Sequence, residues 1–169
     1  MLKKKLSALF KATLASVLLL LPFEGVGALE DETNGLVYPV MSPRKSSPFG
    51  PRNHPIHKVR RHHNGVDLAA PERAPIRAIK QGVVVFADPY GGYGNLIVVQ
   101  HLNGYTSHYG HCFDMTVQPG DKVKAGQIIG SVGSTGAVTG PHLHFEIRRN
   151  GSPKNPEQFI PALGEKGKG

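Results

Sequence analysis

Residues 82–109 read GVVVFADPYGGYGNLIVVQHLNGYTSHY, and their composition indicates the fold class. They hold three runs rich in β-branched and aromatic residues, which are typical of strands. The turns between them contain Gly91-Gly92 and Asn103-Gly104, pairs that favour tight reversals of the chain. The three runs are residues 82–87, 95–100 and 104–109. The stretch therefore predicts neighbouring antiparallel strands.

The same pattern continues outward from this stretch. Residues 127–132 and 143–148 are further strand-like runs, and Pro119-Gly120-Asp121 marks a turn between strands. Beyond the N-terminal segment, no stretch keeps a helical period of 3.6 residues. We expect an all-β domain over residues 37–162, mainly an antiparallel sandwich or a partly open barrel.

Length and composition set the limits of this expectation. The 169 residues suffice for one domain with a core, and 39% hydrophobic with 19% charged residues exclude a membrane bundle and a charge-rich disordered chain. Cys112 is the only cysteine, so a scaffold of internal disulfides is excluded. The net charge of +8 is compatible with an anionic partner.

The N-terminal segment accounts for part of that charge. Four Lys precede residue 12, and residues 12–23 carry no charge. A basic head, a short apolar run and the small residues Val26-Gly27-Ala28 predict a secretory signal peptide over 1–28, the alternative being a buried amphipathic helix. Its removal lowers the net charge to +5. We expect a linker over 29–36 and a flexible tail over 163–169.

The predicted leader sets the compartment. We expect an exported protein in the periplasm or outside the cell, at the bacterial envelope, with no membrane span after the leader is cleaved. A basic surface there meets anionic wall polymers. The chain lacks the basic stripe with interleaved aromatic residues that single-stranded nucleic acid requires, so we expect no nucleic-acid partner.

The nine histidines are the most informative residues, because all of them lie between His54 and His144. In His142-Leu143-His144, side chains two apart on a strand share one face and lie roughly 6.6 Å apart. Leu143 is then free to enter the core. Of two imidazoles on one surface, one can bind a metal ion while the other contacts a group bound to that metal.

A second motif, His63-Asn64-Gly65-Val66-Asp67, offers further ligands. Fully extended, His63 and Asp67 would lie roughly 13 Å apart. The Asn64-Gly65 step allows a bend that brings both side chains inward, although a plain hairpin explains the same residues. Imidazole and carboxylate suit zinc, and three protein ligands leave one coordination position open, as in catalytic sites.

Taken in order, the motifs of this chain resemble those of the LytM/lysostaphin-type zinc metallopeptidases, and they cover roughly residues 37–160. The segments that carry the resemblance are Ser47–Arg52, His63–Asp67, Gly91–Asn95, Tyr109–His111, Ser134–Gly136 and Gly140–Glu146. The resemblance implies a fold of the duplicated hybrid motif type, with long loops forming a groove. It also implies one Zn²⁺ per chain and cleavage of peptide bonds in bacterial peptidoglycan.

Carried over by position, the resemblance makes His63, Asp67 and His144 the zinc ligands. It makes His111 and His142 the catalytic histidines, which flank the water and the substrate carbonyl. The hypothesis is metal-assisted amide hydrolysis, in which one of these two imidazoles takes a proton and the other orients the water or stabilises the oxyanion.

Three neighbouring residues have an expected supporting or structural role. We expect Glu146 to support the strand or a ligand, and His108 to face away from the site because it lies three residues before His111. Cys112 stands where the family usually has an apolar residue, and we expect it to point away from the metal because adjacent strand side chains point in opposite directions.

Two other functions compete with the zinc endopeptidase. A catalytically inactive regulatory module of the same fold, which activates another wall hydrolase, typically loses metal ligands. A histidine-rich metal-storage protein needs a closed site and binds several zinc ions weakly. Zinc stoichiometry and cleavage of purified wall material separate these functions.

Overall fold

The computed structural model describes residues 35–42, 44–53, 60–160 and 163. The predicted leader over 1–28 lies outside these residues, as do most of the linker and of the tail. In the described part, no helix has the length and apolar character needed to cross a membrane. The elements are, in order, β1 (Arg44–Ser47), β2 (Gly50–Asn53), β3 (Arg60–His63), β4 (Val66–Ala69), β5 (Pro75–Arg77), β6 (Gly82–Pro89), η1 (Gly91–Tyr93), β7 (Asn95–Gln100), η2 (Leu102–Gly104), β8 (Tyr105–Met115), β9 (Lys122–Val123), β10 (Ile128–Val132), β11 (Leu143–Arg149), β12 (Ser152–Lys154) and η3 (Pro156–Gln158).

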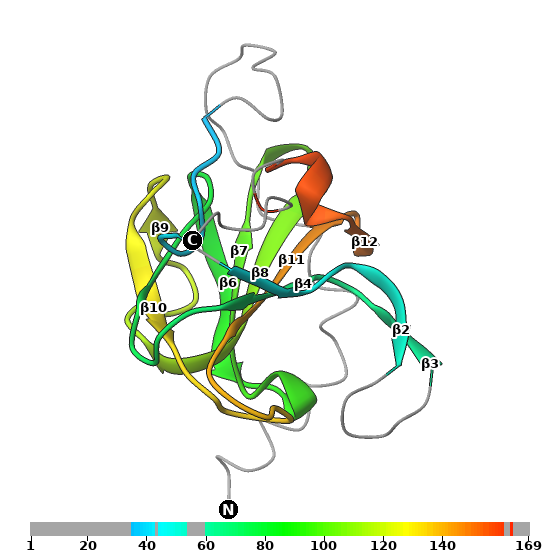
Figure 1. Cartoon of the computed structure of the whole chain (residues 1–169). Helices are drawn as coiled ribbons and strands as arrows, with labels where there is room; N and C mark the ends of the chain where they lie inside the picture. Colours follow the sequence, from blue (N-terminus) through cyan, green and yellow to red (C-terminus); the bar gives the residue numbers. More distant parts are fainter. Residues whose placement is uncertain (1–34, 43, 54–59, 161–162, 164–169) are drawn as a thin grey trace, which may run out of the picture. The chain divides into compact units, whose positions relative to one another are not determined.

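The strands form one large antiparallel sheet with the order β1-β4-β11-β8-β7-β6-β9 (Figure 1). To this order, β12 adds beside β11, and β10 pairs with both β5 and the end of β8. The strands β2 and β3 form a separate two-stranded ribbon that leads directly into β4. The all-β antiparallel expectation is confirmed, and residues 82–109 form β6, β7 and the first part of β8, which pair in this order.

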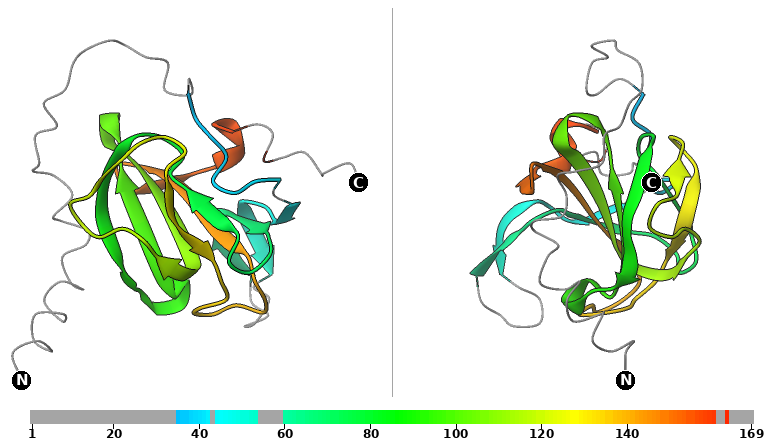
Figure 2. Two further views of the ribbon diagram at one scale, coloured as in Figure 1. Left: turned by 90° about the vertical axis from the view of Figure 1, so that its left-hand side faces the viewer. Right: turned by 180° about the vertical axis from the view of Figure 1, so that it is seen from behind.

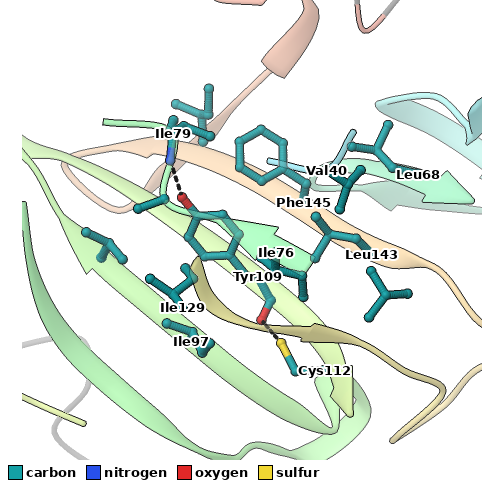
Figure 3. Close-up of a cluster of buried hydrophobic side chains, with 14 of the residues drawn as sticks. Val40, Leu68, Ile76, Ile79, Ile97, Tyr109, Cys112, Ile129, Leu143 and Phe145 are labelled. Carbon is teal, nitrogen blue, oxygen red and sulfur yellow. Dashed lines mark hydrogen bonds between the residues drawn. The ribbon is translucent and has the colours of Figure 1, made fainter. Parts of the chain in front are cut away.

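The sheet curls back on itself and encloses a single core (Figure 2). Strand β10 lies across from β7, so that Ile129 and Ile97 belong to the same buried cluster as Tyr109 and Phe145 (Figure 3). The hydroxyl of Tyr109 accepts a hydrogen bond from the backbone N–H of Ile79 at 2.9 Å. Each fully buried aromatic or aliphatic side chain of this kind stabilises the fold by about 1.5–3 kcal/mol.

Strand β11 divides its side chains between the core and the opposite face. Leu143, Phe145 and Ile147 are buried in the hydrophobic cluster. By the alternation of a strand, His144 and Glu146 point to the other face. The register pairs His144 with Asp67 on β4 and with Gly110 on β8. Packing of the apolar side chains of β11 in the core thus fixes the position of His144 and Glu146 on the opposite face.

A β-bulge interrupts β8 beside this point. The register passes from Ile97↔Tyr109 to Asn95↔Cys112, so β8 carries one residue more than β7 between these pairs. His111 occupies the bulge with a φ of 64°, in the left-handed region that L side chains seldom adopt. The bulge turns His111 to the face of His144 and sends Cys112 into the core, where its thiol donates to the carbonyl of Tyr109 at 3.2 Å (Figure 3).

The step from β3 to β4 needs a residue without a side chain. A Cβ on Gly65 would lie 2.2 Å from the carbonyl oxygen of Phe145 and 2.8 Å from Cγ of Glu146. Glycine therefore lets this corner lie directly against β11. The contact joins the two histidine motifs.

The ends of the described part reach the core. Leu36 packs against it, and the backbone N–H of Val37 donates to the carbonyl of Ile79 at 2.9 Å. Leu163 is 2% exposed and belongs to the same cluster. Core contacts thus include Leu36, the last residue of the expected linker, and Leu163, the first residue of the expected tail.

Candidate metal centre and flanking histidines

Three buried side chains converge where β3, β4 and β11 meet. Asp67 Oδ1 lies 3.1 Å from His63 Nε2 and 2.9 Å from His144 Nδ1, and the two histidine nitrogens are 3.1 Å apart. The bend at Asn64-Gly65 therefore brings His63 and Asp67 together, as the spacing predicts. Among the described residues, these three form the group of His, Cys, Asp and Glu side chains able to hold a metal ion. We call His63, Asp67 and His144 the metal group.

Hydrogen bonds behind the two histidines determine which nitrogen of each ring faces the others. His63 Nδ1–H donates to the carbonyl of Pro48 at 2.7 Å, and His144 Nε2–H donates to Glu146 Oε1 at 2.9 Å. His63 therefore presents Nε2, whereas His144 presents Nδ1. Partners of this kind fix the tautomer and orientation of a ligand histidine.

The spacing of the three atoms fits zinc. Tetrahedral zinc with bonds of about 2.0–2.1 Å separates its ligand atoms by roughly 3.3 Å. The three distances between the atoms of His63, Asp67 and His144 are close to this value, at 2.9–3.1 Å. Two imidazole nitrogens and one carboxylate oxygen also match the preferences of this ion.

The electrostatics of the group match a cation site. Burial opposes ionisation of Asp67, but hydrogen bonds from His144 and His63 hold the pKa of its carboxyl well below the usual range. Burial likewise favours a neutral His144, yet its hydrogen bonds to Asp67 and Glu146 raise the pKa of the ring to about 9. Asp67 is thus kept in the ionised form that a metal ion requires of a carboxylate ligand.

His111 and His142 stand beside this group without joining it. Their rings are 4.7 Å apart between centroids, and His111 lies 5.8 Å from the ring of His144. Nδ1–H of His111 donates to the carbonyl of Thr135, and Nδ1–H of His142 donates to the carbonyl of Gly140, both at 2.9 Å. Nε2 is therefore the remaining nitrogen of each ring.

The two rings differ in what surrounds them. Nε2 of His142 lies 3.7 Å from Asp67 Oδ1. Burial, followed by the nearby rings of His142 and His144, lowers the pKa of His111 to about 4. His111 is therefore neutral at physiological pH and able to accept a proton.

The remaining described histidines have local partners. His62 packs its ring against Phe49. His101 bonds through Nδ1 to the carbonyl of Gln81 and through Nε2 to the hydroxyl of Ser107, both at 2.8 Å. Both ring nitrogens of His101 are therefore used within the fold. His54 and His57 lie outside the described residues.

The expectation that His108 faces away from the site is wrong. Because the bulge at His111 resets the alternation, His108 pairs with Glu146 and shares the face of the metal group. Its Nε2 hydrogen-bonds to the hydroxyl of Thr106 at 3.0 Å. Cys112 points away from this face as expected, and burial raises the pKa of its thiol to about 12.

Two residues behind the group were not predicted from the sequence. Tyr93 and Arg148 both donate hydrogen bonds to Glu146, the carboxylate that also accepts the Nε2–H of His144. Arg148 follows Glu146 by two residues on a strand, so the alternation of β11 is a signal that places it on the same face. No local signal brings Tyr93 here, because η1 approaches β11 from a distant part of the sequence.

Comparison with known proteins assigns the chain to a family. Residues 61–156, more than half of the sequence, match the family described as Peptidase family M23. The chain belongs to this family. The match includes all five residues of the predicted site, from His63 to His144, and the resemblance to LytM/lysostaphin-type peptidases is confirmed.

Two relatives match the chain over part of their own length. The chain is 46% identical over 131 residues to the DD-carboxypeptidase/endopeptidase Mpg of Neisseria meningitidis, covering 77% of this chain and 30% of that protein. It is also 46% identical over 120 residues to the peptidoglycan DD-endopeptidase ShyA of Vibrio cholerae, covering 70% of this chain and 28% of that protein. The match thus spans less than one third of the length of either relative.

Solved structures show the same fold. A zinc-containing peptidase from Vibrio cholerae superposes with a TM-score of 0.65 at 38% identity, over 70% of this chain and 37% of that one. The catalytic domain of lysostaphin from Staphylococcus simulans gives a TM-score of 0.64 at 36% identity, over 70% of this chain and 92% of that domain. The M23 fold of this chain is therefore that of the lysostaphin catalytic domain.

Proposed function

We propose that this M23 chain is a zinc-dependent endopeptidase that hydrolyses peptide cross-links or stem peptides of bacterial peptidoglycan. The proposal rests on one observation: three buried side chains able to bind a metal ion converge beside His111 and His142. Each of these two histidines uses Nδ1 for a backbone hydrogen bond, so its Nε2 is the nitrogen left for the reaction. The relatives named as a carboxypeptidase/endopeptidase and as a peptidoglycan endopeptidase support the reaction and the substrate class.

His63, Asp67 and His144 would hold one Zn²⁺ ion per chain, a proposal that the zinc-containing relative of the same fold supports. Zinc bound there would act as a Lewis acid toward water and toward the scissile carbonyl group. Three protein ligands are the number found in catalytic zinc sites, where the fourth position is open.

His111 and His142 would carry out the proton transfers. Each ring is held by its Nδ1–H on a backbone carbonyl, so each presents Nε2 in a fixed direction. Either His111 or His142 would act as the base, and the other would orient the attacking water or stabilise the oxyanion. Burial lowers the pKa of His111 and keeps its ring neutral, and Nε2 of His142 lies 3.7 Å from Asp67.

The location follows from the substrate. Peptidoglycan lies outside the cytoplasmic membrane, so the predicted leader over 1–28 would direct the chain to the periplasm or to the cell exterior. The basic surface would face an anionic wall polymer. Relatives acting on peptidoglycan support this envelope location.

Two variants test the proposal. His144→Ala should abolish binding of one zinc per chain and cleavage of isolated peptidoglycan, because it removes a ligand. His142→Ala should keep the zinc and lower turnover by about 10²–10⁴, because it removes only a proton-transfer group. Loss of neither zinc nor cleavage in His144→Ala contradicts the metal site. A wild-type protein that binds zinc without cleaving supports the inactive regulatory module instead.

A further inference from the structure

A fully buried carboxylate lies directly behind His144. Glu146 is 0% exposed and receives three donors, which are His144 Nε2–H at 2.9 Å, Tyr93 O–H at 2.7 Å and Arg148 Nε–H at 2.6 Å. The first two reach Oε1, and the third reaches Oε2. Every oxygen of this carboxylate therefore has a partner within the protein.

The donors are held in turn by their own neighbours. Arg148 Nη2 donates to the hydroxyl of Tyr93 at 3.1 Å, and the side chain of Asn64 hydrogen-bonds to the same hydroxyl. The ring of Tyr93 also packs edge-on against the ring of His144, with 5.4 Å between centroids. Asn64 belongs to the motif of His63 and Asp67, so the cluster joins both halves of the metal group.

The chemistry of this cluster selects one nitrogen of His144. A carboxylate has only acceptor oxygens, so the ring nitrogen that faces Glu146 must carry a hydrogen. This leaves Nδ1 as the atom directed toward Asp67 and His63. Without the carboxylate, the ring would be free to flip or to change tautomer, and either change removes a ligand atom.

We infer that Glu146, held by Tyr93 and Arg148, is a positioning residue that fixes His144 with Nδ1 as its metal-binding atom. The inference rests on the proposed function, because it concerns the same metal centre. It assigns to Glu146 an action on metal affinity rather than a step on the substrate. Partners of this kind typically change metal affinity 10- to 100-fold.

Glu146→Gln tests the inference, because an amide offers one acceptor oxygen to three donors. We expect zinc affinity, measured by competition with a chromogenic chelator, to fall 10- to 100-fold. Glu157→Gln is the matched control, because it neutralises a carboxylate that is paired with Lys45 away from the site. Its zinc affinity should stay within about twofold of wild type.

A second measurement separates positioning from stability. In the zinc-loaded wild type, ¹⁵N NMR should show His144 bound through Nδ1 and carrying an Nε2 proton that exchanges slowly. In Glu146→Gln, that proton should exchange faster. If Glu146→Gln does not fold, Tyr93→Phe decides, since it removes one donor to Glu146 and should weaken zinc binding about two- to tenfold.

The outcomes distinguish the inference from the proposed function. A wild type that binds no zinc refutes both. If the wild type binds zinc, an unchanged affinity in folded Glu146→Gln refutes the positioning role alone. With that variant unfolded, an unchanged affinity in Tyr93→Phe refutes it instead. Binding of zinc through Nε2 of His144 also refutes it.

Discussion

Gly65 provides the sharpest test of how the fold positions the metal group. In Gly65→Ala, the added Cβ would lie 2.2 Å from the carbonyl oxygen of Phe145, whereas ordinary contacts of a Cβ begin at 3.4 Å. The corner before β4 and strand β11 must therefore separate by about 1 Å. Zinc ligands tolerate displacements of about 0.2 Å, and β4 carries Asp67 while β11 carries His144. Zinc affinity should fall at least about tenfold.

The same clash should also destabilise the fold. Overpacking of a buried site costs about 1–3 kcal/mol, which lowers Tm by roughly 4–12 °C for a domain of this size. Thermal unfolding in chelator gives the stability effect, and competition titration gives the zinc effect. Gly92→Ala is the control, because its Cβ would come no closer than 3.8 Å to Ala137. If Gly65→Ala matches this control in both measurements, the close approach to β11 does not position the ligands.

Three further perturbations test separate parts of the structure. Cys112→Ala should retain one zinc per chain and lose about 1 kcal/mol of stability, because the thiol is buried in the core; loss of zinc in this variant would make the thiol a ligand. Burial, reinforced by Arg148 and opposed by Glu146, depresses the pKa of His108 to about 3. The contribution of this neutral ring to the free energy of unfolding is therefore complete above about pH 6.5 and is lost as the pH falls toward 3. At pH 5 the loss should be about 2 kcal/mol, and denaturant unfolding of His108→Gln in chelator should lack it, whereas an equal pH slope in both proteins argues against this origin. Zinc at 100 times its Kd should stabilise the wild type by about 2.7 kcal/mol and raise Tm by about 10 °C, and an unchanged Tm would exclude a site confined to the folded state.

Much of the fold could be predicted because local patterns agree with the final structure. The run at 95–100 has the composition of a buried strand and forms β7 within those bounds. The alternation of His142, Leu143 and His144 likewise places the two histidines on one face of a strand and Leu143 on the other, whichever strands lie beside it. The pairing of β10 with both β5 and β8 could not be predicted, because it depends on contacts distant in sequence.

The site shows the same division. His63 and Asp67 lie close in sequence, so a bend at Gly65 is enough to bring them together. The bulge at His111 has no such signal, because a histidine rather than a glycine adopts the positive φ. This single irregularity turns His111 toward the metal group and overturns the expected direction of His108. The cluster around Glu146 also depends on a tyrosine brought from η1, which no spacing along β11 indicates.

Digestion of purified peptidoglycan sacculi measures whether the chain is a zinc-dependent endopeptidase. The purified chain should be incubated with sacculi in the presence of zinc, with a chelator, and with zinc restored after chelation, and the released fragments identified by mass spectrometry. A zinc-dependent endopeptidase should release soluble fragments with newly formed peptide termini in the first and third samples, and none with the chelator. Zinc-loaded protein that releases no such fragments, or equal release in chelator, would contradict this activity.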